Sequence, residues 1–292
     1  MSTKSRESEN LNINGEIFEF VKTQRAGRSA IYKSTNAYLR IGDPEKIKTD
    51  LNFHKQMEAA NFPVAKVISE GKQDGRAYFI ESSLGDRSFG KIFADDIEKM
   101  GSITQESFNQ FLSVMEKFAY AQLRTRSNEG NYVEFADGIH IDELCAELPE
   151  RASEIIAQFE NVKKKLAPIP FVITHGDFNA NNIYSTGVID LEDSFRAPYG
   201  YDLVGAITHI DYFPDATDFE YFAKYRFSED QKHQYFEVID LISSKANLPP
   251  LSSFLLEFEF SKAVWLLIRM HNSPKLQKFR YDLFTERFLK RI

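Results

Sequence analysis

The chain has 292 residues, 42% hydrophobic and 27% charged, a composition typical of a folded globular protein rather than a disordered one. Its 43 acidic residues outnumber 36 basic ones, and the net charge of −7 argues against a nucleic-acid-binding protein, which needs a clustered basic face. The first ten residues lack the apolar core of a secretory signal, no apolar run is long enough to span a membrane, and one cysteine forms no internal disulfide, so we expect a cytoplasmic protein without membrane contact.

Residues 13–84 are predicted to form a small, strand-rich N-terminal lobe that follows a polar tail of residues 1–12. Short alternating or β-branched runs, separated by turn residues, indicate five antiparallel strands. A helical pattern over residues 45–61 begins after a Gly-Asp-Pro breaker and ends at a Phe-Pro pair. The expected strands cover residues 16–23, 29–34, 37–41, 64–70 and 76–82.

Residues 85–292 are predicted to form a larger, mainly helical lobe. Long amphipathic helices are expected over residues 104–127 and 142–166, and helical periods return after residue 229. Residues 168–198 interrupt this pattern with two short strands around a loop rich in Gly and Asn. The expected fold class is therefore α+β, with a β-rich lobe followed by a helical one.

The most informative segment is THGDFNANNIYSTGVIDLED, residues 174–193. Asp177 opens a loop, Asn182 follows five positions later, and Asp190 stands eight positions further on, behind an apolar run. In phosphoryl transfer a loop carboxylate can orient the attacking hydroxyl and accept its proton, while amide and carboxylate oxygens suit Mg²⁺. The protein-kinase signature has the same order of Asp, Asn and Asp. The pattern therefore predicts a kinase-like site, and the alternative is that these residues only form turns.

HGDFNANN, VIDLED and the YDL of residues 201–203 together resemble the aminoglycoside phosphotransferase family. These small-molecule kinases have a protein-kinase-like fold, and choline and homoserine kinases are among them. The family pattern is His-Gly-Asp, four variable residues, Asn, Ile-Asp and then Asp-Leu, and every position is present here. The resemblance implies a two-lobed protein-kinase-like fold, with Asp177 as catalytic base or orienting carboxylate and with Asn182 and Asp190 as Mg²⁺ ligands.

The resemblance also suggests supporting roles for other polar residues of this segment. His175 stands where the family has a mainly architectural histidine that packs beneath the loop. Asp202 is expected to brace the loop by accepting backbone N–H bonds. Glu192 and Asp193 lie just past the metal-binding strand, where they either support the site or are simply solvated.

In the N-terminal lobe, Arg40 stands where protein kinases have the lysine that binds the α- and β-phosphates, and an arginine can chelate phosphate oxygens with two N–H groups. Asp50 on the helix is the expected acidic partner of Arg40, shorter than the usual glutamate. The competing interpretation is a surface arginine on an edge strand, with Lys33 and Lys48 as the fallback phosphate-binding cations.

Two further parts of this lobe are expected to contact the nucleotide. The turn of residues 24–29 lies between the first two strands and is a candidate phosphate cover through Gly27 and Ser29, although alone it is an ordinary hairpin turn. In the family the adenine binds the backbone of the crossover between the lobes. The corresponding residues here are 81–84, which include Glu81 and Ser83.

The acceptor is expected near the acidic, aromatic stretch of residues 209–222. Clustered carboxylates attract a cationic acceptor, and aromatic faces can hold an ammonium group or a sugar ring. A solvated helix face with core aromatics explains most of these residues better, so Asp211, Asp215 and Asp218 are hints only. Trp265 is interpreted as a core residue.

We therefore expect a Mg²⁺-dependent phosphotransferase that moves the terminal phosphate of a nucleoside triphosphate, ATP in preference to GTP, to a hydroxyl of a small molecule. An aminoglycoside, amino sugar or amino alcohol would suit the acidic stretch, and a monomer or weak homodimer is expected. The alternative is a non-catalytic nucleotide-binding regulatory relative, which only the arginine at the lysine position favours. A metallohydrolase using His175, Asp177 and Asp190 is a weak third hypothesis, because no paired-histidine motif is present.

Overall fold

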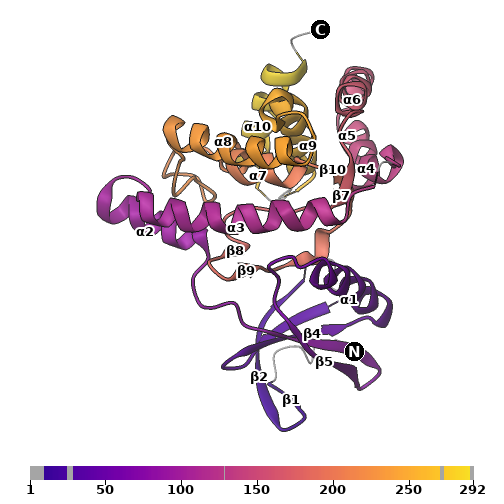
Figure 1. Cartoon of the computed structure of the whole chain (residues 1–292). Coiled ribbons are helices and arrows are strands. Elements are labelled where there is room, and N and C mark those ends of the chain that lie inside the picture. Colours follow the sequence, from indigo (N-terminus) through magenta and orange to yellow (C-terminus); the bar gives the residue numbers. More distant parts are fainter. Residues whose placement is uncertain (1–9, 25–28, 128, 270–272, 290–292) are drawn as a thin grey trace. The chain divides into compact units, whose positions relative to one another are not determined.

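The computed structural model describes residues 10–24, 29–127, 129–269 and 273–289. The described residues divide into two compact units. The first unit combines Met1–Asp86 with Thr186–Glu192, and the second combines Arg87–Ser185 with Asp193–Ile292. A β-rich unit with one helix and a larger, mainly helical unit agree with the expected α+β class (Figure 1).

The first unit contains a six-stranded sheet in the order β1-β2-β3-β4-β6-β5, with antiparallel neighbours throughout. The prediction of five strands is wrong by one, because β1 begins inside the segment that was assigned to the polar tail. It pairs with β2 across Asn14 and Gly15, which both have positive φ and form a tight Asn-Gly hairpin turn. The strands are β1 (Leu11–Ile13), β2 (Glu16–Thr23), β3 (Ser29–Lys33), β4 (Ala37–Gly42), β5 (Val67–Gln73) and β6 (Arg76–Ser82).

Helix α1 (Pro44–Ala59) packs against β4 and β6 of this sheet (Figure 1). It begins where the side chain of Asp43 accepts two backbone N–H groups of the first turn and proline occupies the first helical position. Ile47 and Leu51 bury its apolar face against Phe79 of β6. The same face carries two buried polar residues, Asp50 and His54, which the helix therefore holds beside the sheet.

A short segment from much later in the chain, Thr186–Glu192, completes the first unit. It contains β9 (Gly187–Val188), and the backbone N–H of Val188 donates to the carbonyl of Pro63 at 2.7 Å. A side chain at Gly187 would meet that same carbonyl oxygen at 2.2 Å, so the close approach requires glycine. This contact brings Asp190 into the unit that contains Arg40.

The second unit is built on helices. The predicted helix over residues 104–127 is confirmed as α3. The single helix predicted over 142–166 is instead α5 and α6, separated by a short 3₁₀ turn at Pro149–Arg151, because proline disfavours a helix interior. The elements are α2 (Phe89–Met100), α3 (Gln105–Arg124), α4 (Tyr132–Gly138), α5 (Ile141–Glu147), α6 (Ala152–Leu166), β7 (Phe171–Ile173), β8 (Ile183–Tyr184), β10 (Arg196–Pro198), α7 (Tyr201–Thr208), α8 (Glu229–Lys245), α9 (Leu255–Leu267) and α10 (Pro274–Phe284).

Helix α9 is deeply buried: every residue of it from Glu257 to Leu267 is buried. It packs against α7 and α10. Strand β7, which leads into the HGD loop, pairs antiparallel with β10. No helix among the described residues has the length and apolar character needed to cross a membrane.

Candidate active site

The loop that follows β7 depends on Gly176, the second residue of its His-Gly-Asp motif. Gly176 has φ of +81°, and a Cβ added there would lie 2.0 Å from the carbonyl oxygen of Asp193. Any other residue would therefore be strained in its backbone and would collide with the backbone of Asp193, at the end of a 3₁₀ turn. The glycine of the HGD motif is thus explained by local geometry.

Asp202, the second residue of α7, braces this loop as predicted. Its carboxylate accepts the backbone N–H of His175 at 2.7 Å and that of Gly176 at 3.1 Å, and the amide of Gln122 donates to it at 2.9 Å. His175 is fully buried and its ring packs 5.5 Å from that of Phe178, so it lies beneath the loop, as expected. Charge-assisted bonds from two successive N–H groups fix the backbone before Asp177.

The carboxylate of Asp177 is held by two amide side chains of its own loop. Asn179 Nδ2 donates to Asp177 Oδ1 at 2.9 Å, and Asn182 Nδ2 donates to Oδ2 at 3.3 Å. The same two amides also donate to the backbone carbonyl of Asp177, at 3.2 and 2.9 Å. Each carboxylate oxygen thus has one donor, which sets the direction in which Asp177 points.

The amide of Asn182 is oriented by the same contacts. The backbone carbonyl and carboxylate of Asp177 only accept hydrogen bonds, so Asn182 must turn its NH₂ group toward them. Its carbonyl oxygen Oδ1 is then directed away from Asp177. Because Mg²⁺ prefers oxygen ligands, this orientation fits the predicted role of Asn182 as a metal ligand.

A buried lysine stands beside Asp177. Lys262 of α9 is 1% exposed, and its Nζ donates to the carbonyl of Gly176 at 2.7 Å. Burial alone would raise the pKa of Asp177, but the charge of Lys262 is the largest opposing influence and the net pKa is about 2. Burial in turn lowers the pKa of Lys262 to about 8, against the pull of Asp177 and Asp202. Asp177 is therefore a carboxylate at neutral pH.

Trp265 is buried, as predicted, but it is more than a core residue. The Nζ of Lys262 lies 3.8 Å from its ring centroid, and the guanidinium carbon of Arg269 lies 3.7 Å from it. Arg269 also forms a bidentate ion pair with Asp193, at 2.9 and 2.7 Å. The two open interpretations of Asp193 are thus resolved: it is a paired side chain that ties the end of the HGD region to the segment after α9.

In the first unit, Arg40 is 4% exposed, so the interpretation as a surface arginine is wrong. Its Nε donates to Glu81 Oε1 at 3.2 Å, and both terminal nitrogens lie 3.5 Å from Asp190 Oδ1. Burial would lower the pKa of Arg40, but Glu81 and Asp190 outweigh it and raise the pKa, so the guanidinium stays charged. A fixed, buried cation of this kind is suited to phosphate.

The expected ion pair between Arg40 and Asp50 is not formed, and this prediction is corrected by the structure. Asp50 is 5% exposed and accepts a bond from Lys46 Nζ at 2.7 Å, one helical turn earlier. Burial raises the pKa of Asp50, and Lys46 opposes this rise more strongly than Arg40 does. A lysine four residues earlier lies on the same face of the helix, so Lys46 forms the ion pair with Asp50 that was expected of Arg40.

Asp190, the second predicted metal ligand, has φ of +67° and a side chain that is 18% exposed. Its carboxylate faces two cations, Lys22 Nζ at 3.5 Å and Arg40. A carboxylate that already attracts positive charge is chemically suited to a divalent cation. The residue is thus suited to Mg²⁺, and it shares a unit with the predicted phosphate-binding arginine.

The other predicted nucleotide contacts have varied outcomes. Gly27 lies outside the described residues. Ser29 is buried and its hydroxyl bonds the side chain of Gln24, which closes the turn. Ser83 donates its backbone N–H to Asn36 at 2.8 Å, and its hydroxyl accepts from the N–H of Gly85. The fallback cation Lys33 is partly exposed and pairs with Asp86.

The acidic stretch beyond the loop is partly neutralised. Asp211 lies 3.4 Å from Lys232, and Asp215 lies 2.8 Å from Arg226. Asp218 is exposed, as is Asp215. These contacts favour the interpretation of a largely solvated face.

Three residues of these clusters were missed from the sequence. Asn179 stands two residues after Asp177 inside the motif, where a short-range Asn contact was foreseeable. Glu81 was assigned only by its backbone, although the strand register puts it diagonal to Arg40. Lys262 gave no signal, because it lies in an apolar helix far along the chain, and only the folded structure brings it to Gly176.

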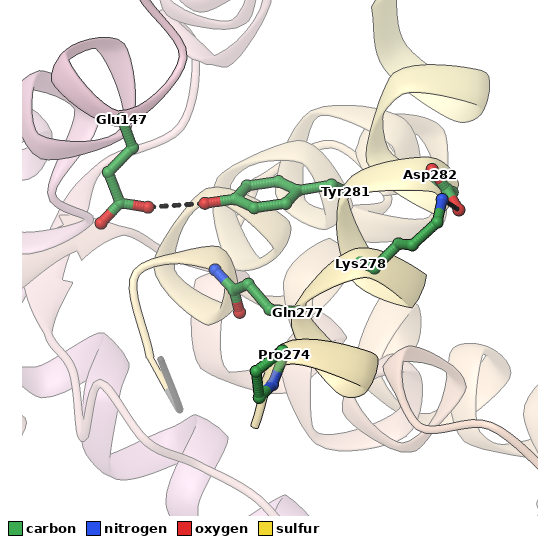
Figure 2. Close-up of a pocket in the computed structure, with 6 residues that line it drawn as sticks. All are labelled: Glu147, Pro274, Gln277, Lys278, Tyr281 and Asp282. Atoms are coloured by element: carbon green, nitrogen blue, oxygen red, sulfur yellow. Dashed lines mark hydrogen bonds and ion pairs between the residues drawn. The ribbon is translucent and has the colours of Figure 1, made fainter. Parts of the chain in front are cut away.

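An open pocket of about 500 Å³ lies elsewhere in the second unit, at α10 and the end of α5 (Figure 2). Figure 2 shows the hydroxyl of Tyr281 pointing at Glu147, at 2.6 Å, while Lys278 pairs with Asp282 at 2.8 Å. Four of the six lining residues thus pair with one another, while the amide of Gln277 donates to the carbonyl of Leu267. None of the predicted site residues lines this pocket, so we assign it no part in the chemistry.

Comparison with solved structures identifies proteins of similar fold. Ethanolamine kinase from Plasmodium vivax has a TM-score of 0.59 and 10% identity, covering 94% of this chain and 83% of that one. A choline/ethanolamine kinase family protein from Mesorhizobium loti has values of 0.55 and 11%, with 92% and 86% covered. A thermostable mutant of an aminoglycoside phosphotransferase, in complex with AMP-PNP and hygromycin B, has values of 0.55 and 13%, with 92% and 93% covered.

At these identities the likeness establishes the fold, and the predicted protein-kinase-like α+β fold is confirmed. Comparison with curated protein sequences gave no match. The model of the phosphotransferase enzyme family matches residues 20–236, which is well over half of the chain and includes Arg40 and the whole HGD segment. The prediction of an enzyme that transfers phosphate is thereby confirmed, and the chain belongs to the phosphotransferase enzyme family.

Proposed function

We propose that this phosphotransferase moves the terminal phosphate of a nucleoside triphosphate, ATP in preference to GTP, to a hydroxyl of a small molecule in a Mg²⁺-dependent reaction. The observation that carries the proposal is the orientation of Asp177. Two amides of its own loop hold its carboxylate, and the backbone before it is fixed by Asp202. Such a group is arranged to meet a hydrogen-bond donor in one direction.

Asp177 serves to align the acceptor hydroxyl. Its two oxygens each have one amide donor, and a carboxylate has further lone pairs that can accept the O–H of an alcohol. Phosphoryl transfer passes through a loose transition state, so positioning and charge matter more than early removal of the proton. The ionised state of Asp177 beside Lys262 is consistent with this aligning role.

The donor side is assigned to the first unit and to Asn182. Arg40 would bind phosphate oxygens through its terminal nitrogens, and Mg²⁺ would be held by Asn182 Oδ1 and the carboxylate of Asp190. When bound, the metal ion compensates the negative charge of the phosphates. The buried guanidinium and the oriented amide are the parts of the chain already arranged for this task.

For the acceptor we propose a small amine-bearing alcohol or sugar. The structural neighbours include an ethanolamine kinase and an aminoglycoside phosphotransferase, which is the support for this class. The ion pairs of Asp211 and Asp215 reduce the support from the acidic stretch. The choice within the class therefore depends on experiment.

The test is a screen of hydroxyl acceptors read by release of ADP or GDP. The purified chain is incubated with Mg²⁺, ATP or GTP, and ethanolamine, choline, amino sugars or aminoglycosides, and phosphorylated products are identified by mass spectrometry. We expect acceptor-dependent release with ATP that a chelator abolishes. Tight nucleotide binding without release of ADP or GDP would instead favour the non-catalytic relative. In that case phosphate would be transferred neither to an acceptor nor, slowly, to water.

A further inference from the structure

The acidic partner of Arg40 comes from a neighbouring strand and not from helix α1. In the antiparallel register Arg40 of β4 is opposite Phe79 of β6, and Glu81 follows two residues later. Side chains two positions apart on a strand share one face, so Glu81 and Arg40 are diagonal neighbours on the same side of the sheet. Their Nε–Oε1 distance is 3.2 Å, and both side chains are buried.

The second oxygen of Glu81 lies beside a buried histidine. His54 of α1 places its Nδ1 3.4 Å from Glu81 Oε2, while its Nε2 lies 2.6 Å from the carbonyl oxygen of Ala65. His54 is 2% exposed. The carboxylate of Glu81 is thus bonded at one oxygen by the arginine, and its other oxygen lies next to the ring of a buried histidine.

This contact determines which way the guanidinium points. Glu81 occupies Nε, and both terminal nitrogens of Arg40 then face Asp190, the proposed metal ligand. The terminal nitrogens form the end of arginine that best chelates phosphate oxygens. A guanidinium held in this way loses less side-chain freedom when it binds an anion.

Asp50, the acid that the sequence pattern suggested, is engaged elsewhere. Its Oδ1 is bonded to Lys46, and its Oδ2 has no hydrogen-bond partner among the described residues. Asp50 therefore acts on Arg40 only through its charge and from further away than Glu81 does.

We propose that Glu81 is the positioning residue of Arg40: it orients the guanidinium toward the phosphates of the donor and takes the place of an acid on helix α1. The inference rests on the proposed function, because it assumes that Arg40 binds the donor. It goes further by assigning the positioning task to Glu81 of strand β6.

A buried ion pair could instead serve stability alone. Taking both charges out of water costs free energy, so such a pair is by itself weak evidence of a stabilising role. The two roles differ in what they predict for ligands. If Glu81 positions Arg40, its loss weakens the binding only of ligands that carry phosphates. If Glu81 only stabilises the sheet, its loss weakens ATP and adenosine equally.

The test compares ATP with adenosine across a set of isosteric variants. Dissociation constants are measured for Glu81→Gln, Asp50→Asn and the wild type, by calorimetry for Mg²⁺–ATP and by competition for adenosine. We expect Glu81→Gln to weaken ATP about tenfold, the loss of one charged hydrogen bond, and to leave adenosine unchanged. Asp50→Asn should change ATP affinity less than about twofold, because Asp50 does not contact Arg40.

A double-mutant cycle makes the test specific to the pair. In an Arg40→Met background, Glu81→Gln should no longer change ATP affinity, because the side chain that Glu81 orients is gone. The inference is overturned if Glu81→Gln binds ATP like the wild type, if it weakens adenosine equally, or if Asp50→Asn has the larger effect. Failure of the wild type to bind either ATP or GTP would contradict the proposed function itself, a separate outcome.

Discussion

The two charged clusters of this protein are built in opposite senses. Around Arg40 a cation is oriented by carboxylates, Glu81 on one side and Asp190 on the other. Around Asp177 a carboxylate is oriented by amide donors, with a buried lysine beside it. A fixed cation is arranged to meet an anion, and a fixed carboxylate to meet a hydrogen-bond donor.

Under the proposed function, this difference corresponds to a division of phosphoryl transfer between a cluster that binds the donor and a cluster that aligns the acceptor. The Arg40 cluster lies in the β-rich unit and is suited to the phosphates of the donor. The Asp177 cluster lies in the helical unit and is suited to the hydroxyl of the acceptor. If the two tasks are separate, a substitution in one cluster should impair donor binding or acceptor alignment, but not both.

The largest expected effect is on turnover in Asp177→Ala. Without the aligning carboxylate, kcat should fall at least about a thousandfold, a loss typical of a group that orients and accepts a proton in the transition state. The measurement is acceptor-dependent ADP release at saturating ATP. Asp137→Ala, which removes an exposed aspartate of α4, serves as the matched control and should keep wild-type turnover.

The next largest effect concerns the glycine that shapes the loop. Gly176→Ala should lower the free energy of unfolding by about 3 kcal/mol or more, because a Cβ would collide with the carbonyl of Asp193 and the φ is positive. Gly101→Ala is the control: its φ is also positive, at +76°, but no atom lies within 4 Å, so only about 1 kcal/mol should be lost. Urea unfolding measures both, and equal losses would mean that the collision is relieved.

Lys262 should make stability depend on pH in the alkaline range. Its pKa is lowered from 10.5 to about 8 by burial, so the unfolded chain binds more protons between these values and stability rises with pH. The wild type should gain about 2 to 3 kcal/mol across this window relative to Lys262→Met, which has no such group. Urea unfolding of both proteins at pH 7.5 and pH 10 measures this difference. If the free energy of unfolding changed equally with pH in both proteins, folding would not lower the pKa of Lys262.

The smallest effect is expected in the acidic stretch. Asp211→Asn should change the KM of a cationic acceptor less than about twofold, because Lys232 already compensates the charge of this partly exposed aspartate. Steady-state kinetics with the best acceptor of the screen provides the measurement. A rise of tenfold or more would place Asp211 in direct contact with the acceptor.

The parts predicted well from sequence are those that a motif or a short-range signal marks. The brace at Asp202 and the buried His175 were expected from the resemblance to a family motif, and the structure has both at the HGD loop. The missed strand β1 was also a local matter, since Asn14–Gly15 is a hairpin signal whose first strand begins in the segment that was assigned to the tail. The single helix predicted across Pro149 failed because an apolar period continued through a residue that breaks helices.

The parts that sequence could not supply depend on competition between partners. Two acids were candidate partners of Arg40. Asp50 is bonded by Lys46 of its own helix, and Arg40 is bonded by Glu81 instead. Lys262 lies in a helix that is buried at nearly every residue, so no periodicity marked it as a neighbour of the HGD loop. Contacts of this kind depend on how distant segments pack, so the sequence pattern alone does not predict them.

The division of labour between the two clusters is tested most directly by the dissociation constant of Mg²⁺–ATP, measured by calorimetry for Asp177→Ala beside Arg40→Met. The account predicts that Arg40→Met weakens ATP about tenfold or more, whereas Asp177→Ala stays within about twofold of the wild type even though its turnover is lost. A loss of ATP binding in Asp177→Ala that matches its loss of turnover would contradict the account, because Asp177 would then hold the structure together and not align the acceptor.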